Sequence, residues 1–294
     1  MKIIVLGASG MLGFGIFKSL SLNEKFDVFG TVRSIRKFKN IFSEEELNKI
    51  IQFDAMDQED HLQEILGEVS PDYVINCIGL ITQEDTNDKS ATPYILLNSL
   101  FPHKVAKECS DHGVKLVHFS TDCVFSGSMG NYSEKSIPDA VDYYGRSKLL
   151  GEIEFSPHLT IRTSIIGHEL FTNKSLIDWF LSQDEVHGYT NAVFSGLPVN
   201  HISDVLNDFV LGKTELKGIY HLSADPINKY ELLKKVALIY EKNIKINRNK
   251  DYIVDKSLDS SRFKKITGYS SPSWDKLITS MHNYYLQNFF HKLT

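Results

Sequence analysis

Short apolar runs alternate with segments of helical periodicity along the first half of this 294-residue chain. Continuous apolar runs rich in β-branched residues predict strands at residues 2–6, 26–32, 50–53, 73–78, 114–120 and 159–166. Apolar residues at helical spacing predict helices at residues 11–20, 58–69, 93–112 and 144–155. This alternation indicates an α/β fold, and strands without polar alternation are typical of a parallel sheet covered by helices on both faces.

The pattern becomes looser after residue 167. It predicts helices at residues 174–182, 202–211, 229–241 and 273–290, with short strands at 192–196 and 218–222. No flexible linker, internal repeat or low-complexity tract separates the two halves. We therefore expect a domain at residues 1–167 and a smaller C-terminal α/β substrate lobe at residues 168–294. Chain crossovers are expected between them, and a cleft where they meet would hold a substrate.

A glycine-rich loop follows the first expected strand directly. Residues 7–13 read Gly-Ala-Ser-Gly-Met-Leu-Gly and lie between that strand and the next helix. Glycines at such a position permit a tight turn and close backbone approach to a pyrophosphate, which the helix N-terminus attracts. The loop predicts a Rossmann-type doubly wound parallel sheet that binds NAD(P). The cofactor-binding residues expected in it are Gly7, Ser9, Gly10, Met11, Leu12 and Gly13.

The following strands end in further candidate cofactor contacts. Arg33 stands where NAD-selective domains place an acid that holds the ribose diol, so it predicts a preference for NADPH, with NADH as the alternative. Asp54, followed by Ala55, is placed either to accept from an adenine amino group or to cap a helix near residue 58. The fourth strand closes with residues that would line the middle of the cofactor, namely Cys77, Ile78 and Gly79.

Tyr144 and Lys148 lie four residues apart on an expected helix, which puts a phenol and an ammonium on one face. A nearby cation favours phenolate, so we expect Lys148 to move the pKa of Tyr144 toward the range of a general acid or base. Tyr143 competes for this role, but the residue four positions after it is Ser147, which carries no charge. We assign Tyr143 a structural role.

Composition excludes several classes of function. The net charge of −5 and the dispersed basic residues argue against nucleic-acid binding. No apolar run is long enough to cross a bilayer, and the glycine at position 7 cuts the first run too short for a signal peptide, so we expect a soluble cytoplasmic protein without membrane partners. The three cysteines and eleven histidines show no metal-binding spacing, so no metal is expected.

Five ordered motifs resemble the extended short-chain dehydrogenase/reductases, and more narrowly the dTDP-4-dehydrorhamnose reductase group. They are residues 7–13, Ser-Thr-Asp-Cys-Val-Phe-Ser-Gly at 120–127, Tyr-Gly-Arg-Ser-Lys-Leu-Leu-Gly-Glu at 144–152, Ile-Arg-Thr-Ser-Ile-Ile-Gly at 161–167 and Pro-Val-Asn-His-Ile-Ser-Asp-Val at 198–205. The resemblance implies that Thr121 holds a substrate carbonyl, Tyr144 donates a proton, and Lys148 binds the ribose and tunes Tyr144. It also places Asn98 near the cofactor. The implied reaction is reduction of the 4-keto group of a nucleotide-activated 6-deoxy sugar, in polysaccharide or deoxysugar synthesis.

Departures from the family pattern affect the expected substrate contacts. Asp122 is followed by Cys123 where dehydratases carry a glutamate, so elimination of water is not expected. Cys123 and Ile165 replace aromatic residues of the reductase group, which leaves the identity of the sugar open. Trp179 and Tyr189 belong to the expected substrate lobe, where packing is the favoured role and contact with the substrate the alternative. Asp122 and His201 complete the candidate substrate residues.

Two alternative functions stay open at this point. One is a nucleotide-sugar epimerase, which would retain its cofactor and turn over without net oxidation. The other is a regulatory subunit, because the β subunit of methionine adenosyltransferase resembles the same reductases. Dimers are common in the wider family, so a homodimer is a further expected assembly, although no heptad or extended apolar face predicts one.

Overall fold

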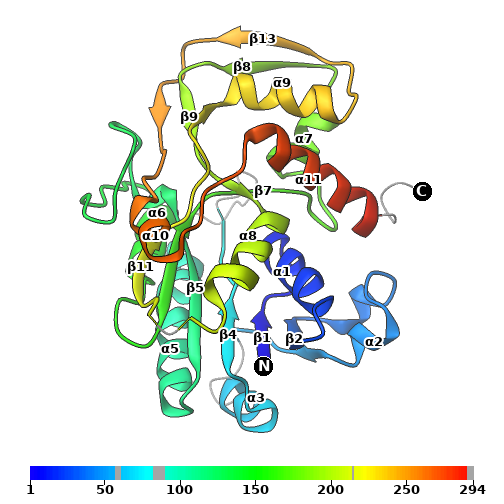
Figure 1. The fold of residues 1–294 in the computed structure, drawn as a ribbon, viewed down its shortest axis with the longest axis vertical. Coiled ribbons are helices and arrows are strands. Elements are labelled where there is room, and N and C mark those ends of the chain that lie inside the picture. The colour runs from blue at the N-terminus through cyan, green and yellow to red at the C-terminus, as the bar shows by residue number, and fades with distance from the viewer. Residues whose placement is uncertain (57–60, 82–89, 214, 290–294) are drawn as a thin grey trace. The chain divides into compact units, whose positions relative to one another are not determined.

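The computed structural model describes residues 1–56, 61–81, 90–213 and 215–289, which group into two compact units (Figure 1). Unit 1 comprises Met1–Val124, Ala140–Ile161 and Gly212–Ile219. Unit 2 comprises Phe125–Asp139, Arg162–Leu211 and the chain from Tyr220 onward. The main change of unit along the chain therefore lies between residues 161 and 162 rather than 167 and 168, and two short segments group with the other unit.

A seven-stranded sheet organises the first half of the chain. Its order is β11-β6-β5-β4-β1-β2-β3. The strands are β1 (Lys2–Leu6), β2 (Asp27–Val32), β3 (Ile50–Gln52), β4 (Tyr73–Asn76), β5 (Lys115–Thr121), β6 (Leu159–Thr163) and β11 (Gly218–His221). Strands β1 to β5 pair in parallel, and the chain direction across the sheet reverses between β1 and β4. This is the doubly wound arrangement, and ligands bind such sheets at the carboxyl ends of the two strands where the order reverses.

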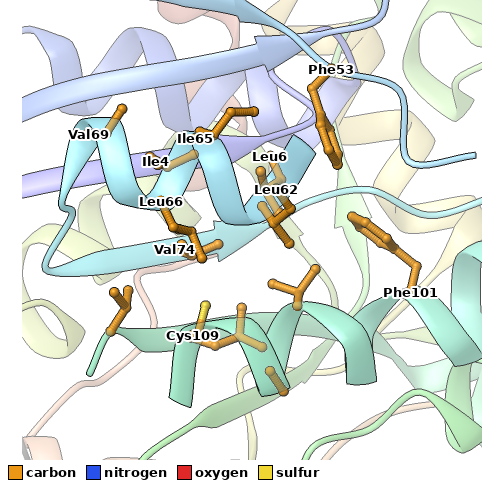
Figure 2. Close-up of a cluster of buried hydrophobic side chains, with 14 of the residues drawn as sticks. Ile4, Leu6, Phe53, Leu62, Ile65, Leu66, Val69, Val74, Phe101 and Cys109 are labelled. Carbon is orange, nitrogen blue, oxygen red and sulfur yellow. The ribbon is translucent and has the colours of Figure 1, made fainter. Parts of the chain in front are cut away.

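Helices of unit 1 bury both faces of the sheet. They are α1 (Met11–Ser21), α2 (Glu44–Leu47), α3 (His61–Val69), α4 (Thr92–Tyr94), α5 (Phe101–Asp111) and α6 (Tyr143–Leu150), with 3-10 turns η1 (Ile35–Phe38) and η3 (Asp122–Val124). On one face, α3 and α5 enclose a core with alternate residues of the strands, among them Ile4, Leu6 and Val74 (Figure 2). The strand pleat directs Ile3 and Val5 to the opposite face, where α1 contacts β1 and β2. Burial on both faces explains why these strands read as continuous apolar runs.

The long helix expected at residues 93–112 contains an irregular segment. It runs as α4, a π-helical segment η2 (Ile95–Leu100) and α5. A π-helical turn inside a helix commonly marks a functional position. Helix α6 is also shorter than expected, because Gly151 ends it where residues to 155 were expected to continue. Of the helix expected at 58–69, residues 58–60 lie outside the described residues.

Unit 2 contains small sheets and several helices. The strands are β7 (Ile165–Ile166), β8 (Glu185–Tyr189), β9 (Ala192–Phe194), β10 (Leu197–Pro198), β12 (Ile227–Asn228), β13 (Lys245–Asn249) and β14 (Val254–Asp255). The helices are α7 (Leu176–Leu181), α8 (Val199–Val205), the π-helical η4 (Leu206–Val210), α9 (Lys229–Ile239), α10 (Ser261–Thr267) and α11 (Trp274–Asn288). Strands β8 and β13 pair in parallel beside α9 (Figure 1). The sequence predicted helices at the positions of α7, α8 with η4, α9 and α11. It did not predict α10 or the strands β8, β10, β12, β13 and β14.

Candidate active site

The glycine loop after β1 is held by its own backbone and by β2. Gly7 has a φ of +83°, a conformation that glycine adopts without strain. Its N–H donates to Thr31 Oγ1 at 3.0 Å, and the N–H of Ala8 donates to Thr31 O at 2.8 Å. Gly13 lies so close below the loop that a Cβ there would be 2.2 Å from Gly7 O. Helix α1 then begins at Met11 without a side-chain cap, so its first N–H groups are left for a bound anion.

A pocket of about 230 Å³ opens at the carboxyl ends of β1 to β4. Nine of the expected cofactor-binding residues line it, namely Gly7, Ser9, Gly10, Arg33, Asp54, Ala55, Cys77, Ile78 and Gly79. Thr31, Val32, Phe53, Met56, Leu80 and Leu97 complete the lining. The other six expected cofactor-binding residues do not line this pocket, namely Met11, Leu12, Gly13, Asn98, Tyr144 and Lys148. The lining suits a dinucleotide, because backbone at a helix N-terminus meets an apolar floor and a cation at the end of β2.

Arg33 and Asp54 both line this pocket, but they differ in their exposure and in their hydrogen bonds. The Arg33 side chain is exposed, and β2 ends in Val32 with no acid at the position that would hold a ribose diol. Asp54 Oδ1 accepts from the N–H of Met56 at 3.0 Å, so the carboxylate closes a local turn two residues on. The contact that the structure describes for Asp54 is therefore that of a turn residue.

Thr121 and Tyr144 bring two hydroxyl groups together at the end of β5. The Thr121 hydroxyl lies close enough to the Tyr144 phenol to lower its pKa. Thr121 is 6% exposed, and its hydroxyl donates to Asp122 Oδ1 at 3.2 Å and accepts from the N–H of Cys123 at 3.1 Å. Tyr144 lies in the first turn of α6, whose N-cap Asp142 accepts from the N–H of Gly145. Tyr143, by contrast, is 58% exposed.

Burial dominates the protonation of both members of the Tyr144–Lys148 pair. Burial raises the pKa of Tyr144, and Cys123, Asp122 and Asp142 raise it further, while the nearby Thr121 hydroxyl lowers it. The expectation that Lys148 brings this pKa down is therefore wrong for the structure as it stands, because desolvation outweighs any stabilisation of the phenolate. Lys148 is 6% exposed, its Nζ donates to Phe119 O at 2.6 Å, and burial lowers its pKa to about 8.

Asn98 connects the loop after β4 to helix α6. It is fully buried in the π-helical segment η2, and its amide pairs with both backbone groups of Leu80, at 2.7 Å to Oδ1 and 2.9 Å from Nδ2. Nδ2 also donates to Ser147 Oγ at 3.1 Å. A Cβ placed on Gly79 would lie 3.4 Å from Asn98 Oδ1 and 3.7 Å from Lys148 Nζ. The pocket lined by Gly79 therefore adjoins the Lys148 ammonium.

The remaining candidate substrate residues lie in unit 2. Ile165 is half-buried in β7, and His201 on α8 pairs through Nε2 with the Tyr269 hydroxyl at 3.0 Å. Trp179 is 40% exposed on α7 and Tyr189 is 36% exposed at the end of β8. Neither aromatic side chain is fully buried, so packing inside the lobe and contact with a substrate both stay open for these two residues. Tyr189 makes an edge contact with Tyr252, with ring centroids 5.5 Å apart.

Sequence reasoning missed several polar side chains that hold the site together. Thr31 fixes the glycine loop, Ser147 bonds Asn98, and Ser120 Oγ donates to the buried Glu152 at 2.6 Å. Three of these residues belong to the sequence motifs quoted above, namely Ser120, Ser147 and Glu152. Their positions near Thr121 and Lys148 were the signal that could have identified them. Their partners come from other elements, which spacing along the chain does not indicate.

Among the described residues, no helix is long and apolar enough to cross a membrane, and no group of three or more metal-ligating side chains converges. His118 on β5 is fully buried and accepts from Asn76 Nδ2 at 3.2 Å.

Sequence comparison identifies relatives of several activities. The chain is 32% identical to a probable low-salt glycan biosynthesis reductase, Agl14, of Haloferax volcanii over 52% of this chain and 48% of that protein, so the match spans about half the length of that relative. It is 24% identical to a dTDP-4-dehydrorhamnose reductase of Aggregatibacter actinomycetemcomitans, over 76% of this chain and 74% of that protein. It is also 24% identical to the β subunit of methionine adenosyltransferase 2 of Danio rerio, over 80% of this chain and 73% of that protein.

Solved structures and a family model agree with the observed fold. A hypothetical dTDP-4-dehydrorhamnose reductase from Sulfolobus tokodaii matches with a TM-score of 0.74 and 25% identity, over 94% of this chain and 98% of that one. A dTDP-4-dehydrorhamnose reductase from Bacillus anthracis, in complex with NADP, matches with a TM-score of 0.77 and 20% identity, over 96% and 99%. The family model for the RmlD substrate binding domain matches residues 1–285. The chain therefore belongs to the RmlD family, the group of proteins similar to dTDP-4-dehydrorhamnose reductase.

Proposed function

We propose that this protein is an NADPH-dependent reductase of the 4-keto group of a nucleotide-activated 6-deoxy sugar. The observation that carries the proposal is the Thr121 hydroxyl beside the Tyr144 phenol, one helical turn from the buried Lys148 ammonium. Next to Lys148, at Gly79, begins the pocket with the glycine loop. A ketone reductase needs this combination of a hydroxyl to hold the carbonyl, an acid to protonate it and a dinucleotide site beside both.

The residues divide the reaction between them. When bound, NADPH supplies the hydride that reduces the carbonyl carbon. Thr121 holds the carbonyl oxygen with its hydroxyl, and Tyr144 gives its phenolic proton to that oxygen, so that the C=O group becomes CH–OH. Burial raises the pKa of Tyr144, so the phenol keeps its proton at neutral pH until the oxygen becomes basic. The Lys148 cation then stabilises the phenolate left behind.

Arg33 supports NADPH as the reductant. Its guanidinium is exposed at the pocket and stands at the end of β2, where a 2′-phosphate would lie. Helix α1 and Gly7 to Gly13 would receive the pyrophosphate, and Asp54 is near enough to the same pocket for the adenine. The similar B. anthracis reductase, whose structure contains NADP, supports the same choice.

The direct test measures NADPH oxidation with dTDP-, UDP- and GDP-linked 4-keto-6-deoxy sugars. In the Tyr144→Phe variant, turnover should fall about 100-fold or more because the proton donor is lost, while NADPH affinity stays close to that of the wild type. Tyr143→Phe is the matched control, because it removes a neighbouring hydroxyl that is exposed, and it should leave turnover nearly unchanged. Equal turnover in wild type and Tyr144→Phe would contradict the proposed acid.

A second candidate function is that of a regulatory subunit. It is favoured by the similarity to the β subunit of methionine adenosyltransferase 2, which extends over 80% of this chain. A stoichiometric complex with an adenosyltransferase catalytic subunit, together with NADPH binding and no reduction of any sugar in the panel, would support this candidate. An enzyme that retains its cofactor through purification and converts sugars without net oxidation would instead be an epimerase.

A further inference from the structure

A buried carboxylate follows the helix of unit 1 that carries Tyr144 and Lys148. Glu152 is 7% exposed and follows helix α6, four residues after Lys148. Its Oε1 accepts from Ser120 Oγ at 2.6 Å. Ser120 stands between Phe119, whose carbonyl accepts from Lys148 Nζ at 2.6 Å, and Thr121, whose hydroxyl lies beside Tyr144. The segment from Phe119 to Thr121 therefore carries one contact each for Lys148, Glu152 and Tyr144.

Other ionisable groups near Lys148 are held neutral. Burial raises the pKa of the Cys77 thiol, which follows β4, and lowers the pKa of His118 on β5 well below its usual range. Burial likewise raises the pKa of Tyr144 on α6. A buried ammonium without a nearby anion tends to lose its proton, and the described surroundings of Lys148 offer Glu152 as the carboxylate that offsets this tendency.

We propose that Glu152 is a positioning residue of the reductase, whose buried carboxylate keeps Lys148 protonated and fixes the end of α6 to β5 through Ser120. The role deepens the proposed function and rests on it, because a cationic Lys148 is what stabilises the Tyr144 phenolate. Glu152 itself does not touch the substrate or cofactor in this role. It acts only through Lys148 and through the β5 segment that carries Thr121.

The test compares Glu152→Gln with Glu154→Gln. Glutamine keeps an oxygen that can accept from Ser120 but removes the charge. Glu154 is exposed two residues further along, so its substitution removes the same charge without the buried contact. Lysine labelled with ¹³C at the ε-carbon reports the titration of Lys148, and a Lys148→Arg spectrum assigns the signal. The pKa of Lys148, lowered by burial to about 8, should fall by about one pH unit or more in Glu152→Gln and stay in place in Glu154→Gln.

The activity measurement adds a second, separate readout. In Glu152→Gln, the loss of kcat at alkaline pH should begin at a lower pH by a similar interval, whereas the KM for NADPH near pH 6 should stay within about twofold of the wild type. An unchanged Lys148 titration in Glu152→Gln overturns the proposal. If the protein reduces no sugar, the NMR titration still decides the role of Glu152, so failure of the proposed function is recognised separately. Should Glu152→Gln not fold, Glu152→Asp retains the anion and must keep the Lys148 titration within about half a pH unit of the wild type, or the proposal fails.

Discussion

At the scale of a single residue, the exposed Arg33 is the side chain expected to favour NADPH over NADH. It lies at the rim of the pocket, and no acid occupies the end of β2 to favour a free ribose diol. A bidentate contact between a guanidinium and a 2′-phosphate is a strong charge-assisted interaction. NADH has no 2′-phosphate and cannot make this contact, so Arg33 should strengthen the binding of NADPH only.

The Arg33→Ala variant should therefore lose affinity for NADPH selectively. We expect the Kd for NADPH to rise about tenfold or more, which corresponds to about 1.4 kcal/mol or more, while the Kd for NADH changes by less than about twofold. Fluorescence titration with both cofactors measures this. Lys25→Ala, an exposed cation before the other end of β2, should change neither value. Equal affinities of the wild type for both cofactors would contradict the expected preference.

At the scale of elements, the packing of α1 against the glycine loop determines whether the dinucleotide site can form. The distance from a Cβ on Gly13 to Gly7 O would be 2.2 Å, so the helix or the loop must move to accept any side chain. Gly67 in α3 has open space around its Cβ position. The two glycines therefore differ in packing although both lie inside helices.

Gly13→Ala should destabilise the protein by about 1–3 kcal/mol and weaken NADPH binding, because the loop that meets the pyrophosphate is displaced. Gly67→Ala should instead stabilise it by about 0.5–1 kcal/mol, since alanine loses less entropy in a helix. Urea unfolding of both variants, together with NADPH titration, measures these effects. A Gly13→Ala protein with native stability and affinity would show that the close approach is not required.

At the scale of the whole molecule, burial of the Lys148 ammonium lowers the stability of the folded protein. Its pKa is 10.5 ordinarily and about 8 in the folded protein, so the unfolded chain binds this proton more tightly. The penalty is present in full below about pH 8, where both states are protonated, and it is relieved as the pH rises from about 8 toward 10.5. This difference between the two pKa values corresponds to a destabilisation of about 3 kcal/mol.

Lys148→Met should consequently unfold at a higher urea concentration than the wild type at pH 7. The lost hydrogen bond to Phe119 O offsets part of the gain, by about 1–2 kcal/mol, which leaves a net stabilisation of about 1–2 kcal/mol. The gain should shrink between pH 8 and pH 10, because the wild type is then relieved of the same penalty. Lys135→Met, at an exposed lysine, should stay within about 0.5 kcal/mol of the wild type at every pH.

The sequence by itself determined the elements whose signal is local. Strands β1, β2 and β5 were predicted to within about one residue, because burial on both faces makes them continuous apolar runs with polar boundaries. The glycine loop was predictable for the same reason, since strand, turn and helix follow one another along the chain. Strand β13 was missed, because no residue of its sequence Lys-Ile-Asn-Arg-Asn is fully buried and the sequence carries little hydrophobic signal.

Only the tertiary structure decided the environment of the candidate catalytic side chains. The sequence placed Tyr144 and Lys148 on one helix, but their protonation follows from desolvation, which depends on what β4 and β5 bring against that helix. The π-helical turn at Asn98 accompanies contacts with Leu80 and Ser147, 18 and 49 residues away in sequence. Hydrogen bonds and burial across such separations have no period along the chain, whereas strands and helices do, and this difference separates what was predictable from what was not.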